Sequence, residues 1–185
     1  MMSIDAKEAA LALSDIDAIV HRVRQSRIYR IASLMLILWG VLVFAGNIAS
    51  FLLPRYAGYI WIAVNAVGIA ATFAVSALSG RQLNTQGFDL RMVAAFALFF
   101  AFGILWSVVI GHFGPRQLGA FWPTYFMMVY TIAGLWAGAA FVAIGLGVTA
   151  LTLITYFLAG DWFELWMAFV NGGGLLLGGL WMRRS

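Results

Sequence analysis

Six apolar stretches of about twenty residues each fill this chain between residues 31 and 182, and none of them contains Lys, Arg, Asp or Glu. The hydrocarbon core of a bilayer is about 30 Å thick, so about 20 helical residues are enough to cross it. In lipid every backbone amide needs an internal hydrogen-bond partner, which favours α-helices. The sequence therefore predicts an all-α integral membrane protein with six transmembrane helices, over residues 31–52, 58–78, 92–112, 118–137, 139–159 and 165–182.

Charged residues make up 10% of the 185 residues, whereas about 25% is usual in a soluble domain. We expect two parts, a cytoplasmic arm over residues 1–30 and a transmembrane domain over residues 31–185. The first 30 residues are polar and charged, so no cleavable signal peptide is expected. The chain has no Cys, which excludes disulfides, thiolate metal ligands and lipid attachment through Cys.

The basic residues fall mostly on one side of the predicted spans. Cytoplasmic ends of transmembrane helices carry an excess of Lys and Arg, so this side is assigned to the cytoplasm. An even number of spans also puts both termini on one side. The cytoplasmic side receives Lys7, Arg22, Arg24, Arg27, Arg30, Arg81, Arg91, Arg183 and Arg184, and the other side receives Arg55 and Arg116.

The arm has the pattern of an amphipathic helix. Ser14 can cap its start, with Asp17 three residues on in a capping-box position. Four apolar residues then share one face at helical spacing, and four arginines lie in the second half of the arm. The apolar residues are Ile16, Ile19, Val20 and Val23, and the arginines are Arg22, Arg24, Arg27 and Arg30.

Three uses compete for this arm. It could determine topology by lying along anionic headgroups, to which each Arg contributes about 1 kcal/mol. It could instead dock a cytoplasmic protein partner, with Arg22, Arg24, Arg27 and Arg30 as the contact residues. Nucleic acid is not expected as a partner, because a single helix offers few phosphate contacts.

The last span contains Asn171-Gly172-Gly173-Gly174, and the second contains Asn65-Ala66-Val67-Gly68. Consecutive glycines weaken a helix, and unwound segments of transporters expose carbonyls that hold substrates or ions. Glycine and asparagine also serve close packing and hydrogen bonding between membrane helices. The packing interpretation is favoured here. If a ligand site exists, its candidate residues are Asn47, Asn65, Tyr130 and Asn171.

A modest polar stripe follows the fourth and fifth spans. It could line a path for a small neutral solute. More often, a Thr hydroxyl bonds the carbonyl of the preceding turn, and we expect that here. The stripe consists of Thr124, Tyr130, Thr131, Thr149, Thr152 and Tyr156.

The chain also divides into three helical hairpins with similar sequence patterns. Gly40, Gly103 and Gly147 lie near the middles of the first, third and fifth spans, and a Trp follows each of them about twenty residues later. This spacing is compatible with a threefold hairpin repeat around an axis along the membrane normal.

Two segments near the start of the first span, 29–33 and 36–40, read Tyr-Arg-Ile-Ala-Ser and Leu-Ile-Leu-Trp-Gly. With the Arg-rich arm before them, they resemble a group of uncharacterised six-helix bacterial inner-membrane proteins. The likeness extends to residues 121–124, 134–136 and the Gly-rich last span. The resemblance implies the bacterial inner membrane as the location. It implies no activity.

The predicted spans lack the chemistry that most membrane enzymes and pumps require. Proton-coupled pumps place ionisable residues inside the bilayer, and the six spans contain no Asp, Glu, Lys or Arg. His21 and His112 fall on opposite sides, so they cannot hold a haem or metal together. The sequence predicts no catalytic residues, no metal site and no cofactor, and therefore no enzyme.

Two functions fit these observations. The leading hypothesis is a polytopic protein of interaction or regulatory type, which docks a cytoplasmic partner through its arm. The alternative is a permease or channel for a small neutral or apolar solute. Small-residue helix faces also permit a homo-oligomer, and the lipid bilayer is a partner in every case.

Overall fold

The computed structural model describes the backbone of residues 6–83 and 90–184, and the side chains of residues 29–75, 91 and 93–184. Within these ranges the chain is helical and has no strands. The elements, in chain order, are α1 (Ala6–Leu52), η1 (Pro54–Tyr56), α2 (Ala57–Leu83), α3 (Leu90–Ile104), η2 (Leu105–Ile110), α4 (Pro115–Ala137), α5 (Ala139–Leu158), η3 (Gly160–Trp162), α6 (Phe163–Met167), η4 (Ala168–Gly173) and α7 (Gly174–Arg184).

Six helical stretches in the described residues are long and apolar enough to cross a membrane. They coincide with the six predicted spans, and η3, α6, η4 and α7 together form the sixth. The boundary between the fourth and fifth spans falls at Gly138, whose φ of 131° is open to glycine and strained for other residues. These properties support a multi-pass membrane protein.

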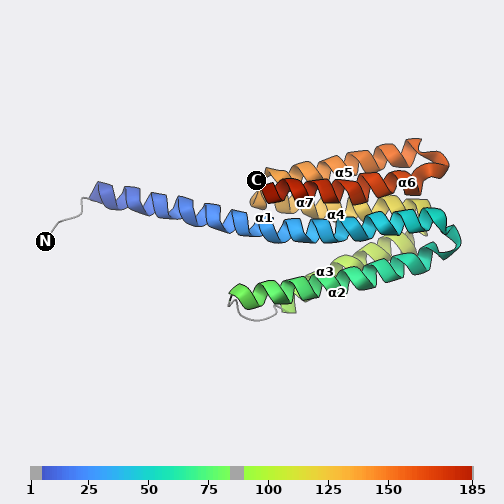
Figure 1. Ribbon diagram of the computed structural model, residues 1–185, viewed down its shortest axis with the longest axis horizontal. Helices are drawn as coiled ribbons and strands as arrows, with labels where there is room; N and C mark the ends of the chain where they lie inside the picture. The colour runs from blue at the N-terminus through green and yellow to red at the C-terminus, as the bar shows by residue number, and fades with distance from the viewer. Residues whose placement is uncertain (1–5, 84–89, 185) are drawn as a thin grey trace.

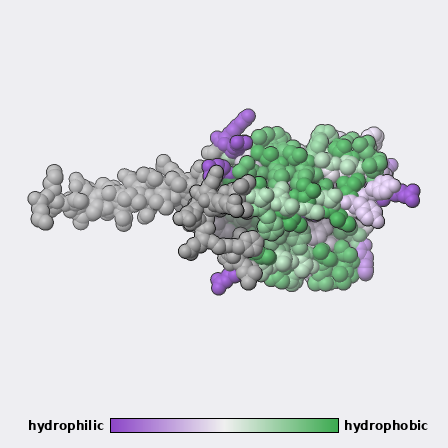
Figure 2. All heavy atoms as spheres, turned by 60° about the horizontal axis from the view of Figure 1, so that its bottom comes forward, coloured by the Kyte–Doolittle hydropathy of each residue, from purple (hydrophilic) through white to green (hydrophobic). Residues whose placement is uncertain are grey.

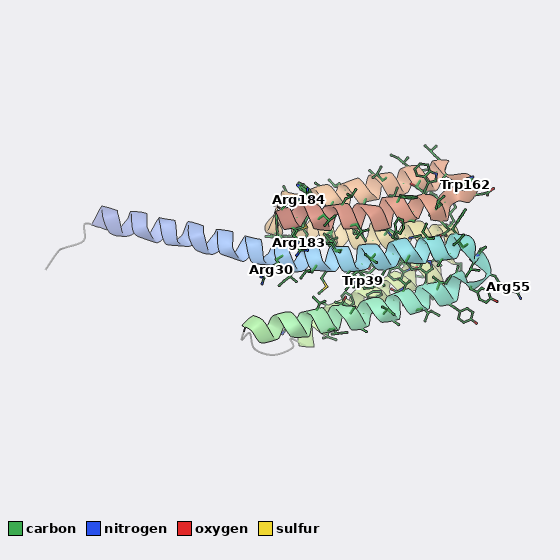
Figure 3. The ribbon with its side chains drawn as sticks, viewed as in Figure 1. Arg30, Trp39, Arg55, Trp162, Arg183 and Arg184 are labelled. Atoms are coloured by element: carbon green, nitrogen blue, oxygen red, sulfur yellow. The ribbon has the colours of Figure 1, made fainter. Side chains whose placement is uncertain are left out.

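The spans run side by side as a bundle, and α1 extends beyond one end of it (Figure 1). The chain reaches the C terminus at that same end. Arg30, Arg183 and Arg184 lie there, whereas Arg55 and Trp162 lie at the opposite end (Figure 3). In the space-filling view an apolar band is flanked by hydrophilic residues at the two ends of the bundle (Figure 2).

Glycines bring α1 into close contact with η4 and α7, along what we call the glycine seam. A Cβ built on Gly172 would lie 2.6 Å from the Cα of Phe44, and one on Gly40 would lie 2.9 Å from the backbone nitrogen of Leu176. A Cβ on Gly179 would lie 2.9 Å from the carbonyl oxygen of Ser33. No side chain fits at these positions without displacing backbone. The Gly-rich last span therefore serves close packing, as expected.

Two apolar clusters fill the bundle. The large cluster joins α1, α4, α5 and α7, and the small cluster joins α4 to α6 near the end that carries Arg55. The buried members of the large cluster are Leu36, Met127, Ala140, Phe141, Ile144, Val148, Leu175 and Met182, and those of the small cluster are Ala120, Phe163 and Met167.

Helices α2 and α3 lie at the edge of the bundle. Helix α2 packs on α1, where the Trp39 indole nitrogen donates a hydrogen bond of 3.1 Å to the Thr72 hydroxyl. Helix α3 packs on α4, where Phe99 stacks on Tyr125 with ring centroids 4.3 Å apart. Most of the other apolar side chains that the structure describes on these two helices are exposed in the isolated chain. Such faces suit contact with lipid tails.

The arm is a continuation of α1, which runs for 47 residues without interruption. Our expectation that its helix starts at Ser14 is wrong, because α1 begins at Ala6. Ser14 is therefore an interior residue of the helix. The predicted apolar face of Ile16, Ile19, Val20 and Val23 lies outside the described side chains and stays a prediction.

The predicted hairpin repeat receives no support from the surroundings of its three glycines. Gly40 meets α7, and Gly103 meets the Trp122 ring of the next helix, whereas no described atom lies within 4 Å of a Cβ built on Gly147. The three positions have different packing roles. The repeat remains a sequence pattern.

The glycine seam predicts opposite effects for two adjacent substitutions. Gly172→Ala should destabilise the protein by about 1–3 kcal/mol, because its methyl group would collide with the Phe44 backbone. Gly173→Ala should be neutral or slightly stabilising, because its nearest described neighbour is the Ala168 carbonyl at 4.0 Å. Unfolding of the purified variants in detergent measures both effects. Equal stability of the two variants would contradict the seam.

Candidate functional site

Polar groups interrupt the apolar interior at one level, between the large and small clusters. Three helices contribute to this polar layer, which we define as Pro123 and Thr124 on α4, Thr152 on α5, and Asn171, Gly172 and Gly173 on η4. Each helix has a large-cluster residue on one side of the layer and a residue packed in the small cluster on the other. Apolar side chains therefore lie on both sides of the layer along the bundle, while Pro123, Thr124 and Gly173 are only half-buried.

Helix α5 places Thr152 against the sixth span. Cβ atoms built on Gly178 and Gly174 would meet Ile144 and Val148 of α5 at 2.9 and 3.0 Å. In this antiparallel register, the next turn of α5 brings Thr152 opposite the turn that contains Asn171. Thr152 has no exposed surface, and Asn171 is 6% exposed.

Helix α4 lacks one backbone hydrogen bond at the same level. A Cβ built on Gly145 would lie 2.9 Å from the Met127 carbonyl, and the next turn of α4 contains Pro123. Proline has no N–H, so it cannot donate to the carbonyl of Gly119 four residues earlier. The Thr124 hydroxyl is already engaged with the carbonyls of Ala120 and Phe121, at 3.0 and 2.9 Å.

The third contribution is a π-helical segment, η4, at Ala168–Gly173. Widening of a helix in this way is common at functional sites. At its end the backbone N–H of Gly174 is shared between the carbonyls of Phe169, Val170 and Asn171. One donor thus serves three acceptors beside the layer.

Some hydroxyl groups inside the bundle have a hydrogen-bond partner and others have none in the part of the chain that the structure describes. The Thr131 hydroxyl donates to a carbonyl four residues earlier in its own helix, as we expected for the Thr residues of the polar stripe, and the Ser107 hydroxyl does the same. The hydroxyls of Thr152 and Ser50 find no hydrogen-bond partner among the described residues, although both side chains are buried. The expectation for Thr152 is therefore wrong, and Ser50 did not stand out in the sequence.

The four candidate ligand residues lie in different surroundings. Asn47 and Asn65 each donate their side-chain amide to a carbonyl of their own helix, those of Val43 and Trp61, both at 2.8 Å. Tyr130 lies against Phe141, with ring centroids 5.7 Å apart. Only Asn171 belongs to the polar layer. Asn47 lies one turn beyond Phe44, the residue that meets Gly172, so α1 and η4 bring these two asparagines to neighbouring turns.

Of the arginines predicted to contact a partner, Arg30 is exposed at the end of the bundle from which α1 projects (Figure 3). Arg22, Arg24 and Arg27 lie on the same helix, outside the described side chains. No group of three or more His, Asp or Glu in the described residues could hold a metal ion.

Arg116 has a structural role that the sequence did not reveal. Its guanidinium donates a hydrogen bond of 2.6 Å to the Tyr156 carbonyl at the end of α5. The same group lies over the rings of Tyr156 and Phe163, 5.6 and 5.3 Å from their centroids. It therefore ties the start of α4 to the end of α5 and the start of α6. Only tertiary structure brings these partners together.

Comparison with protein-family models, with curated proteins and with solved structures found no match.

The role of Arg116 predicts unequal effects for the two arginines at this end of the bundle. Arg116→Gln should destabilise the protein by about 1–3 kcal/mol, through loss of a charged hydrogen bond and of contacts with two rings. The matched variant Arg55→Gln should be nearly neutral, because Arg55 is exposed. Thermal unfolding in detergent compares them. Equal losses would contradict a special role for Arg116.

Proposed function

We propose that this chain is a multi-pass protein of the bacterial inner membrane that docks an acidic cytoplasmic protein through its arm. Both termini would lie in the cytoplasm. The observation that carries the proposal is the continuity of α1, which leaves the bundle as one helix (Figure 1). Roughly 25 helical residues, from Ala6 to Arg30, precede the first span, which corresponds to about 37 Å of helix.

The depth of each arginine separates headgroup binding from partner binding. Each headgroup layer is about 5–7 Å thick. Along an α-helix, Arg27 lies about 6 Å beyond Ile31, whereas Arg24 and Arg22 lie about 10 and 13 Å beyond it. Arg27 and Arg30 thus suit lipid headgroups. Arg22 and Arg24 project past them into the cytoplasm, where a protein can reach them.

The predicted apolar face also favours a protein partner. Ile16, Ile19, Val20 and Val23 all lie at least 12 Å beyond Ile31, by about 1.5 Å of rise per residue. Amphipathic helices bury such a face against another surface, and tertiary packing supplies most of their stability. A helix that lies in the membrane interface buries it in lipid, but α1 leaves the bundle as an extension of the first span.

A second copy of the chain fits this arm less well than an acidic partner does. Two copies in one membrane have parallel arms, which brings Arg22, Arg24 and Arg27 of each near the same residues of the other. Like charges at close range oppose association. A surface with an apolar centre and acidic rim satisfies both features of the arm.

The alternative function, a permease for a small neutral solute, has less support. The glycine seam, where backbones are in contact, and the large cluster, which is filled by side chains such as Leu36 and Phe141, leave no evident path between α1, α4, α5 and α7. Asn47 and Asn65 also use their amide groups within their own helices.

Charge reversal tests the docking proposal. Arg22→Glu with Arg24→Glu should abolish recovery of cytoplasmic partners in cross-linking pull-downs from intact membranes. Arg183→Glu with Arg184→Glu changes the same charge at the same end of the bundle and should leave recovery unchanged. Deletion of residues 2–24 should act like the first variant, while insertion persists because Arg27 and Arg30 remain. Recovery of the same partners from the truncated protein would refute the proposal.

A further inference from the structure

Arginines from two neighbouring helices, Arg30 on α1 and Arg183 and Arg184 on α7, lie at the same end of the bundle (Figure 3). The register of the glycine seam explains their placement. The two helices run antiparallel along the seam, and a Cβ built on Gly179 would lie 2.9 Å from the Ser33 carbonyl oxygen. One turn beyond that contact, α7 therefore brings Arg183 opposite the turn of α1 that carries Arg30.

We call Arg30, Arg183 and Arg184 the arginine cluster, and all three are exposed. Among the described side chains the only acidic ones are Asp161 and Glu164, which belong to η3 and α6 at the opposite end of the bundle. No described carboxylate therefore neutralises the cluster. Arg binds phosphate oxygens through two parallel hydrogen bonds, so the cluster favours a phosphate group as its ligand.

Below the cluster, each helix carries a row of exposed apolar side chains on the same face as its exposed arginine. Residues at helical spacing share one face, so the α1 row is aligned with Arg30 and the α7 row with Arg184. The α1 row consists of Leu34 and Val41, and the α7 row consists of Leu177 and Leu180.

The two rows lie on the same flank of the glycine seam. Deeper in the bundle, the Phe44 ring of α1 meets the Phe169 ring of η4 edge to face, with centroids 5.4 Å apart. Phe44 follows Val41 by one turn, and Phe169 lies on the same face as Leu180. The contact between the two rings therefore joins the rows at their deep end.

We propose that an anionic phospholipid binds on this flank, with its phosphate on the arginine cluster and its acyl chains along the two rows. The rows reach about 10 to 17 Å from the arginines, by about 1.5 Å of rise per residue, and the hydrocarbon of one leaflet is about 15 Å deep. A soluble acidic protein would reach the arginines but not the rows. The proposal rests on the membrane location in the proposed function and involves neither Arg22 nor Arg24.

Lipid binding to the purified full-length chain in detergent tests the proposal, with phosphatidylglycerol as the probe. A ligand that binds the folded state raises the Tm as its concentration increases, which gives an apparent Kd. Phosphatidylcholine with the same acyl chains has no net charge and should raise the Tm much less. Inorganic phosphate has the charge without the chains and should also raise it much less. An equal effect of either compound would overturn the proposal.

Substitutions locate the site. Arg30→Gln should weaken phosphatidylglycerol binding about fivefold, and Arg183→Gln with Arg184→Gln should weaken it more than that, because each arginine near the headgroups contributes to the attraction. The matched control is Arg91→Gln at the start of α3, which removes one charge from another helix and should leave the Kd nearly unchanged. Equal losses from Arg30→Gln and Arg91→Gln would show only a general attraction of anionic lipid and would overturn the site.

The lipid site and partner docking can fail separately. Arg183→Glu with Arg184→Glu should lose phosphatidylglycerol binding and keep partner recovery, whereas Arg22→Glu with Arg24→Glu should do the reverse. If the Arg22 and Arg24 variant loses the lipid and the Arg183 and Arg184 variant retains it, the anionic lipid binds the arm, and the site on the flank of the seam is refuted.

Discussion

The close contact of α1 with η4 and α7 is the interaction on which the rest of this structure depends. Between helices surrounded by lipid there is little hydrophobic driving force, so association relies on dispersion contacts between closely approaching surfaces. Gly40, Gly172 and Gly179 allow that approach, because a Cβ at any of them would meet backbone atoms of the other helix. The seam joins the first span to the last and fixes their relative depth. It therefore also fixes where α1 leaves the bundle.

The remaining helices follow from this arrangement. Helices α4 and α5 form a second close pair, where a Cβ on Gly134 would lie 2.7 Å from the backbone nitrogen of Val142. The large cluster fills the space between the two pairs. Helices α2 and α3 attach at the edge through aromatic contacts and leave apolar faces for lipid. The polar layer is the one level, among the described residues of α4, α5 and the sixth span, at which a proline, a π-helical turn and an unpartnered hydroxyl coincide.

The sequence predicted the six spans and their boundaries well, because the thickness of the bilayer and the need for internal hydrogen bonds act on every residue alike. It also favoured packing for Gly172, since glycine in membrane helices usually serves close contact. The predicted start of α1 at Ser14 was wrong, because a Ser residue can cap a helix and can equally lie inside one. The contacts of Arg116 and the missing hydrogen-bond partner of the Thr152 hydroxyl among the described residues depend on which helices pack against each other. The hydropathy of the sequence does not predict which helices become neighbours.

Cross-linking across the glycine seam tests its existence most directly, and the absence of native Cys simplifies the experiment. The rings of Phe44 on α1 and Phe169 on η4 meet across the seam with their centroids 5.4 Å apart, and neither position is a seam glycine. The double variant Phe44→Cys with Phe169→Cys should be joined within one chain by a short thiol-specific bifunctional reagent in membranes, detected by mass spectrometry after digestion. Phe44→Cys with Gly147→Cys should not. Failure of the first pair to cross-link, or equal cross-linking of both pairs, would contradict the seam and the bundle built on it.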